Sequence, residues 1–328
     1  MKKLVYTLCA TLLLLGTACS SDAVLPTATG TANEVLLVIN EDVFKSNVGD
    51  SIIQILNHDV PCMPQSEPMF NISRTNFAGF TSIIKPARNV LMIDAGRAYS
   101  KVKIKTEENK WSSPQAIMTI QGPTTEEVAF AIGKYKQQIA DYFEQAERKR
   151  AIKHHLRYPE EDMVEKVQEH MGFYMAVPRN MNRSKKAENF MWISNSAGNM
   201  NRNIVLYSYP YTEKDAFSRE KILQKRDSVT KLHIPGPVEN SYMTTEYRFE
   251  PPIWGETATA SNQYAIRMQG MWRVEGEFMG GPFVSVSCLD QKNQRIITAE
   301  AFIYAPNEYK RNAMRQLEAA LYTIKPLE

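Results

Sequence analysis

The sequence contains few of the residues that mark several large classes of protein. It has four cysteines in 328 residues and no Cys-x-x-Cys pair, so it is neither a disulfide-dense scaffold nor a protein with a paired-cysteine zinc site. Cys62 and Cys288 either pair in an oxidising compartment or stay free, and their spacing leaves both alternatives open. A net charge of +3 gives no overall field for nucleic acid. Beyond the N-terminus, no apolar run is long enough to predict a membrane-spanning helix.

Catalytic and cofactor motifs are also lacking. There is no Gly-x-Ser-x-Gly elbow, and no Lys-Ser or Lys-Thr follows a glycine pair as in a phosphate loop. The one metal-like group consists of His154, His155, Glu160, Glu161 and His170, but adjacent histidines point about 100° apart on a helix and cannot face one ion. The sequence therefore predicts no catalytic residue, no metal and no cofactor. Whether the protein is an enzyme stays open, with a non-enzymatic role favoured.

The N-terminal residues resemble a targeting signal. Two lysines precede an apolar stretch over residues 4–15, which is too short to span roughly 30 Å of hydrocarbon. Gly16-Thr17-Ala18-Cys19 follows and resembles a bacterial lipobox, although the family pattern prefers leucine where Gly16 stands. We therefore expect residues 1–18 to be a lipoprotein signal peptide and residues 19–32 a flexible tether. A lipid on Cys19 would hold the protein on the periplasmic side of the cell or outer membrane, whereas ordinary cleavage would release it as a soluble periplasmic protein.

The remaining pattern predicts an α+β fold in two halves, residues 33–157 and 158–328. An aliphatic run over 34–40 indicates a strand buried on both faces, and the alternating run over 101–105 indicates an edge strand. One apolar face from residue 124 onward predicts a long helix that ends in the basic triplet 148–150. That triplet either complements the helix dipole or binds phosphate or an acidic partner, and the first interpretation is favoured.

The two halves share an ordered set of dipeptides. Asn-Phe at 76–77 followed by Arg-Asn at 88–89 matches Asn-Phe at 189–190 followed by Arg-Asn at 202–203. This order predicts an internal duplication, with antiparallel or mixed sheets in both halves and the paired Arg-Asn positions as scaffold. The second half is longer, with a charged helix over 215–232 and an antiparallel β region over 244–304. The Gly-Gly-Pro sequence at 280–282 predicts a turn between two of those strands.

The runs at 267–272 and 278–283, ending in Met-Gly-Gly-Pro-Phe, resemble a family of Bacteroidota lipoproteins defined by domain of unknown function 4837. The resemblance covers nearly all of the chain after the signal peptide. It implies an envelope location and lipidation. The family has no assigned activity, so the resemblance carries over no catalytic residue.

Five residues near this motif form a candidate binding surface, namely Arg267, Trp272, Arg273, Gly280 and Gly281. Strand alternation places Arg267 and Arg273 on one face and Trp272 on the other, which favours a core position for Trp272. We therefore expect a non-enzymatic module for interaction or assembly that faces the periplasm and binds envelope proteins. The alternative is a protein that binds or hydrolyses an envelope glycan or peptide at a site between the halves, near these residues. A deep polar pocket there would favour the alternative.

Overall fold

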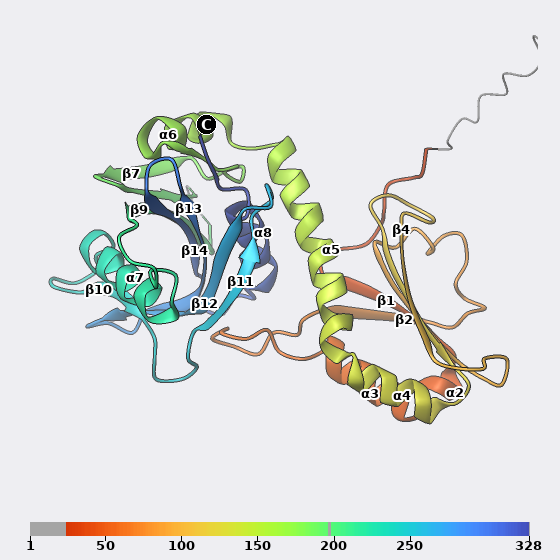
Figure 1. Cartoon of the computed structure of the whole chain (residues 1–328). Coiled ribbons are helices and arrows are strands. Elements are labelled where there is room, and N and C mark those ends of the chain that lie inside the picture. Colours follow the sequence, from red (N-terminus) through yellow and green to blue (C-terminus); the bar gives the residue numbers. More distant parts are fainter. Residues whose placement is uncertain (1–23, 196–197, 328) are drawn as a thin grey trace, which may run out of the picture.

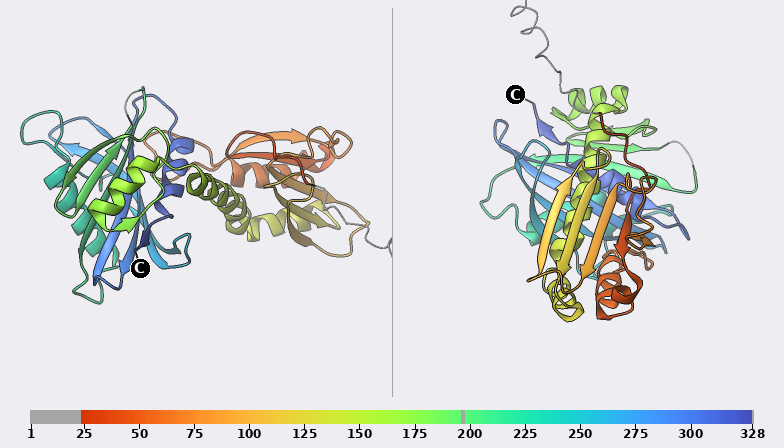
Figure 2. Two further views of the ribbon diagram at one scale, coloured as in Figure 1. Left: turned by 90° about the horizontal axis from the view of Figure 1, so that it is seen from above. Right: turned by 90° about the vertical axis from the view of Figure 1, so that its right-hand side faces the viewer.

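The computed structural model describes residues 24–195 and 198–327. They form two lobes, each built on a β-sheet, and the long helix α5 (Lys136–Arg157) runs between them (Figures 1 and 2). The predicted signal peptide, residues 1–18, and the predicted lipid site, Cys19, lie outside the described residues. In the described part of the chain, no helix combines the length and apolar character needed to cross a membrane.

The first lobe contains a five-stranded sheet. Its strand order is β2 (Asn71–Thr75), β1 (Glu34–Ile39), β3 (Asn89–Ala95), β5 (Ala116–Gly122) and β4 (Lys103–Glu108). The first four strands are parallel, and β4 pairs antiparallel at the edge. Strand β1 is buried on both faces between two neighbours, as the aliphatic run predicted. The lysine-rich edge strand is also confirmed.

Helices cover one face of this sheet. Helices α2 (Glu41–Phe44), α3 (Asn47–Leu56), α4 (Thr125–Lys134) and the start of α5 pack on it, and loop residues from 77–87 and Trp111 cover the other face. The single helix predicted from residue 124 to the triplet 148–150 is wrong. Tyr135, with φ −108° and ψ 21°, interrupts it, and α5 continues to Arg157. The break redirects α5 away from the sheet and towards α8 (Arg311–Leu321).

Part of the predicted tether, residues 19–32, is held by the first lobe. The backbone N–H groups of Ala28 and Thr29 donate to the carbonyls of Ser113 and Pro86, and Arg88 donates back to Thr29. Two parallel bridges result, between Thr29 and residue 87 and between residue 27 and Ser113. The chain is therefore ordered against this lobe from about Pro26 onward.

The second lobe contains an eight-stranded antiparallel sheet, which confirms the longer β region expected in the second half. Its order is β10 (Tyr242–Thr245), β12 (Tyr264–Glu275), β13 (Gly280–Asp290), β14 (Arg295–Tyr304), β9 (Asn201–Pro210), β8 (Phe190–Ser194) and β7 (Arg183–Ala187), and β11 (Ile253–Ala258) pairs with β12. Helices α6 (Glu161–Met171) and α8 pack on one face, together with the short pair β6 (Phe173–Tyr174) and β15 (Lys325–Pro326). Helix α7 (Arg219–His233) packs on the other face.

The α+β class is confirmed, but the internal duplication is wrong. A parallel sheet with one antiparallel edge and an entirely antiparallel sheet have different strand orders, so one cannot be a copy of the other. The paired dipeptides also differ in their surroundings. Arg88 is partly buried and its Nη2 donates to Glu147 at 2.8 Å, whereas Arg202 is exposed. The Asn-Phe and Arg-Asn dipeptides therefore recur in the same order in the two halves without a common fold.

The turn predicted at 280–282 is also wrong. Gly280, Gly281 and Pro282 belong to β13, and the turn lies before them, where Gly276 adopts φ 91°. The absence of a side chain at Gly281 lets β13 pack closely against the Trp272 indole. A Cβ there would lie 3.0 Å from Nε1 of Trp272 and still closer to a backbone carbonyl.

A loop from the first lobe, residues 57–69, reaches onto the second lobe. The Gln269 amide donates to the Pro61 carbonyl at 2.7 Å, and the backbone N–H of Cys62 donates to Glu250 at 2.8 Å. Cys62 in this loop and Cys288 in β13 are both buried free thiols, which settles the question of their pairing in this structure. The loop fixes the two lobes against each other and forms one wall of the cavity between them.

Candidate ligand-binding site between the lobes

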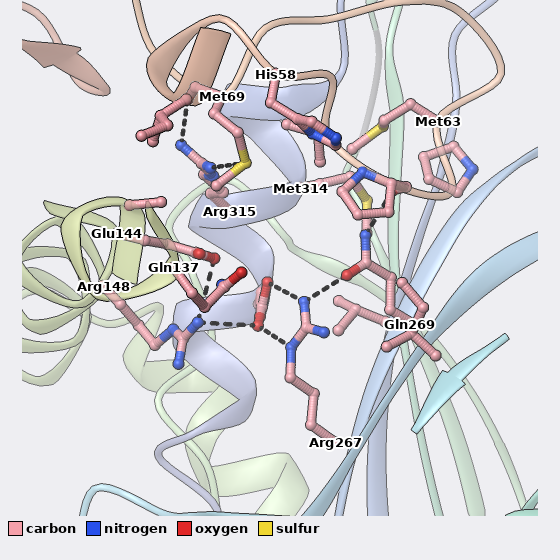
Figure 3. Close-up of a pocket in the computed structure, with 18 of the residues that line it drawn as sticks. His58, Met63, Met69, Gln137, Glu144, Arg148, Arg267, Gln269, Met314 and Arg315 are labelled. Carbon is pink, nitrogen blue, oxygen red and sulfur yellow. Dashed lines mark hydrogen bonds and ion pairs between the residues drawn. The ribbon is translucent and has the colours of Figure 1, made fainter. Parts of the chain in front are cut away.

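A cavity of about 540 Å³ lies where α5, α8, β12 and the 57–69 loop meet (Figure 3). Both lobes contribute to its lining, so it exists only because the lobes are joined. Its polar residues are Ser51, Gln54, His58, Lys136, Gln137, Glu144, Arg148, Arg267, Gln269, Arg315 and Glu318. Most of them are charged or carry amides, so a polar region lies at the boundary of the halves.

Regular secondary structure positions the charged side chains. On α5, Gln137, Glu144 and Arg148 recur at helical spacing and so share the face that looks into the cavity. On β12, Arg267 and Gln269 are two residues apart and point to the same side of the sheet. Sites on helices and strands hold their side chains more firmly than sites on loops.

Arg267 and Glu318 form the best-defined ion pair of the cavity. Nε of Arg267 donates to Oε1 of Glu318 at 2.7 Å, and its Nη2 donates to Oε2 at 3.3 Å and to the Gln269 amide oxygen at 2.7 Å. Burial alone would raise the pKa of Glu318, but the charges of Arg267 and Arg148 outweigh it, and that pKa falls to about 2. Glu318 is therefore a carboxylate at neutral pH.

Arg148 completes a second ionic contact on the α5 side. Its Nη2 lies 3.3 Å from Oε1 of Glu144 and 3.9 Å from Oε1 of Glu318. Its guanidinium also lies over the ring of Tyr322, 4.8 Å from the centroid. Glu318 is thus shared between two arginines that come from different lobes.

Arg315 has a different environment. Its Nη1 donates to the Asn33 side-chain oxygen at 2.7 Å and to the Met69 carbonyl at 2.8 Å, and its Nη2 lies 3.4 Å from the Met69 sulfur. Among the described residues, no carboxylate oxygen lies within 4.0 Å of this guanidinium. Burial lowers the pKa of Arg315, although more distant carboxylates such as Glu144 partly oppose the effect. A partly buried guanidinium without a close counter-ion therefore lines the cavity.

The charges of the lining do not balance. Four cationic side chains face two carboxylates, a formal excess of two positive charges, from Lys136, Arg148, Arg267 and Arg315 against Glu144 and Glu318. A positive excess in a partly desolvated pocket attracts an anion more strongly than the same charges would in water.

The rest of the lining is apolar. It consists mainly of Ile55, Val60, Met63, Met69, Ile253, Pro282, Phe283, Val284 and Met314. Methionine side chains are flexible and polarisable, so three of them allow this wall to adapt to differently shaped apolar groups. The cavity thus pairs a cationic region with an adaptable apolar one.

The structure separates the five residues singled out from the sequence. Arg267 lines the cavity, whereas Trp272 is buried in the core on the opposite face of the sheet, as strand alternation predicted. Arg273 is near the surface and pairs with Glu275 at 2.5 Å. Gly280 and Gly281 lie within β13, and Gly281 packs against the Trp272 indole. Only Arg267 of this set contributes to the site between the lobes.

Sequence reasoning missed the residues that complete the site. Arg315 and Glu318 interrupt the apolar pattern of α8 one turn apart, and this interruption was the available signal. Arg148 was assigned to a helix end, but it lies in the middle of α5 and points into the cavity. Neither helix could be placed beside β12 without knowing the path of the chain.

Comparisons with known proteins match two families. The family model of a domain of unknown function, DUF8532, matches residues 28–155, and that of another, DUF4837, matches residues 160–323. No curated protein matches the sequence. Among solved structures, the lipid transfer and protein localization domain of human StarD13 (DLC2) is 7% identical, with 51% of this chain and 96% of that chain covered and a TM-score of 0.22. A TM-score this low assigns neither fold nor function.

Proposed function

We propose that this chain, which belongs to the DUF4837 family of domains of unknown function, is a binding protein for a small amphipathic anion held between its lobes. The observation that carries the proposal is Arg315. Its guanidinium lines a cavity of about 540 Å³, and no carboxylate of the described residues lies within 4.0 Å of it. An anionic group of a ligand would supply the missing counter-charge.

The two kinds of lining define the ligand class. The cationic side, with Arg148 and Arg315, suits a carboxylate or phosphate, because guanidinium groups match the geometry of both. The apolar side, with Met63 and Met314, suits a hydrocarbon or ring system. A ligand with one anionic end and one apolar end would satisfy both sides at once.

A ligand-binding role replaces the assembly role that the sequence alone favoured. The preference for assembly was based on missing catalytic motifs, and a deep polar pocket between the halves was the feature expected to favour binding instead. The cavity between the lobes combines charged and amide groups with apolar side chains and is lined in part by Arg267, which supports a binding role. No described side chains form a recognisable nucleophile and base in it, so the proposal is binding and does not include catalysis.

A matched pair of ligands tests the proposal. Decanoate and decanol share one hydrocarbon chain and differ in charge at the head group. In calorimetric titrations below the micelle concentration, we expect decanoate to saturate one site with an affinity at least about tenfold higher than that of decanol. Equal affinities, or no saturable binding of decanoate, would contradict the proposal.

We also propose that the protein is anchored by lipid in a bacterial cell envelope. Support comes from the short apolar stretch at 4–15 and the lipobox-like residues that end in Cys19. The anchor would hold the protein, with its cavity, on the periplasmic side of the membrane. In membrane fractionation, Cys19→Ser should move the protein from the pellet to the soluble fraction. An unchanged distribution would rule out this anchor.

A further inference from the structure

A second cavity, of about 410 Å³, lies on the α7 side of the large sheet, and we propose that it binds the neutral sugar ring of a glycan. Side chains from β8, β9, β12 and β14 form its floor, and the loop after α7, at residues 234–237, forms one wall. Pockets of this volume are within the usual range for small-ligand sites, roughly 300–1,000 Å³.

This cavity is separate from the one between the lobes. Arg267 and Gln269 project from β12 towards α8, whereas Trp272 packs with the α7 side of the sheet. The two cavities therefore use opposite faces of one strand. The sugar-binding proposal does not depend on the anion-binding proposal.

Aromatic rings give the floor its character. Phe302 is the central ring, 5.6 Å from Trp272 and 6.2 Å from Trp192 between centroids, and Tyr304 lies 6.2 Å from Trp272. Trp192 and Tyr304 are only partly buried, so parts of their rings are open to a ligand. Sugar rings carry C–H groups on their faces, which pack on aromatic rings, while their edges carry hydroxyls that need hydrogen bonds.

Polar groups border the aromatic floor. Ser194 is directly opposite Asn203 in the register, and Asn203 is directly opposite Phe302, so the three side chains share one face of the sheet. Asn203 orients the nearer tryptophan by accepting a hydrogen bond from Nε1 of Trp192 at 3.0 Å. Hydroxyl and amide groups beside aromatic rings provide both donors and acceptors for sugar hydroxyls.

One buried donor lacks a partner. Trp272 is 3% exposed, and its Nε1 has no hydrogen-bond partner among the residues that the structure describes. Leaving a buried N–H unsatisfied costs about 1–3 kcal/mol, so an acceptor that a ligand brought to this indole would be favourable. Gly281 allows this position, because a side chain there would collide with the indole.

The lining of this cavity carries little charge. Arg183 is the one charged side chain among the described residues around this cavity. The pocket between the lobes, in contrast, has six. Aromatic rings with amides and almost no charge fit a neutral sugar better than an acidic one.

Calorimetric titration of the purified protein with chitotriose, cellotriose and maltotriose tests the proposal. We expect at least one of them to bind saturably. Trp192→Ala, which removes an accessible ring, should weaken that binding at least about tenfold, and Trp272→Phe, which keeps a ring but removes the N–H, should weaken it as well. Trp254→Phe, on β11 away from the cavity, is the control and should bind like the wild type.

Any of three outcomes with the wild type or with Trp192→Ala would overturn the proposal. The first is that none of the three sugars binds. The second is that sugar binding is unchanged in a Trp192→Ala variant that circular dichroism shows to be folded. The third is that a proline-rich peptide, which can also pack on aromatic rings, binds saturably while no sugar does. Arg315→Met should leave sugar binding intact. A loss in that variant would place the sugar in the cavity between the lobes and would also overturn the proposal.

Discussion

Arg267 on β12 donates two hydrogen bonds to Glu318 on α8, at 2.7 and 3.3 Å, in the lining of the cavity between the lobes. Arg148, on α5 at the other side of the cavity, also contacts this carboxylate, with Nη2 3.9 Å from Oε1 of Glu318. Two of the arginines are therefore neutralised within the protein, whereas Arg315 is not. This difference makes Arg315 the expected contact for a bound anion and Arg267 mainly a structural partner of Glu318.

Replacing Glu318 should make stability depend differently on pH. The pKa of this carboxyl is lowered from 4.5 to about 2, so its ionic contribution is fully present above about 4.5 and is lost as pH falls towards about 2. Glu318→Gln should therefore be less stable than the wild type at pH 7, by on the order of 3 kcal/mol, and the difference should shrink in acid. Denaturant unfolding at a series of pH values measures this.

A constant stability difference from pH 7 to pH 2 would contradict that account. It would show that the packing of the side chain, and not its charge, makes the contribution. Glu165→Gln is a suitable control, because Glu165 is exposed on α6 and has no ion pair among the described residues.

Glu67 should hold the lobes together by capping α8. Its buried carboxylate accepts from the backbone N–H groups of Lys310 and Arg311 at 2.7–2.9 Å, and α8 has no side-chain cap of its own. Glu67→Ala should cost about 1–2 kcal/mol and speed amide exchange at the start of α8. Hydrogen exchange that stays unchanged at these two amides would argue against capping across the lobes.

The two buried thiols should react slowly. Burial raises the pKa of Cys62 to about 11, with a further contribution from Glu250, and burial raises that of Cys288 to about 12. In a chain that starts after Cys19, neither thiol should react with a disulfide reagent at pH 8 until the protein is unfolded. Rapid titration of one thiol in the native protein would show that the 57–69 loop opens.

Two similar arginines should differ in their effect on stability. Arg88 donates to the buried carboxylate of Glu147 at 2.8 Å, whereas Arg202 is exposed. Arg88→Ala should cost about 1–3 kcal/mol, and Arg202→Ala should remain within about 0.5 kcal/mol of the wild type. Equal losses in thermal or denaturant unfolding would revive a common scaffold role for both dipeptides.

Local patterns in the sequence predicted local structure well. The buried strand at 34–39 follows from an uninterrupted aliphatic run, and the lysine-rich edge strand and the alternation along β12 follow from the period of two in strands. The break at Tyr135 was missed because the apolar period continues through it, and only the backbone dihedrals show the interruption. The glycines at 280–281 were assigned to a turn, because sequence alone does not reveal that an indole packs over Gly281.

The site could be predicted only in part. Arg267 was identified, and a position between the halves was foreseen as an alternative. Arg148 on α5 lies 167 residues before Arg315 and 170 residues before Glu318, both on α8, and nothing local in the sequence brings them together. Non-local packing of α5 against α8 creates the site, and that packing depends on the path of the whole chain.

The central claim is that the cavity between the lobes selects an anionic amphipath through Arg315. A fluorescence titration with two dyes tests it directly, because 1-anilinonaphthalene-8-sulfonate and N-phenyl-1-naphthylamine share one aromatic framework and differ by the sulfonate. We expect the wild type to bind the sulfonate dye more tightly. Arg315→Met should lose that preference at least about tenfold while still binding the neutral dye, and Arg183→Met should behave like the wild type. An unchanged preference in folded Arg315→Met would contradict the claim.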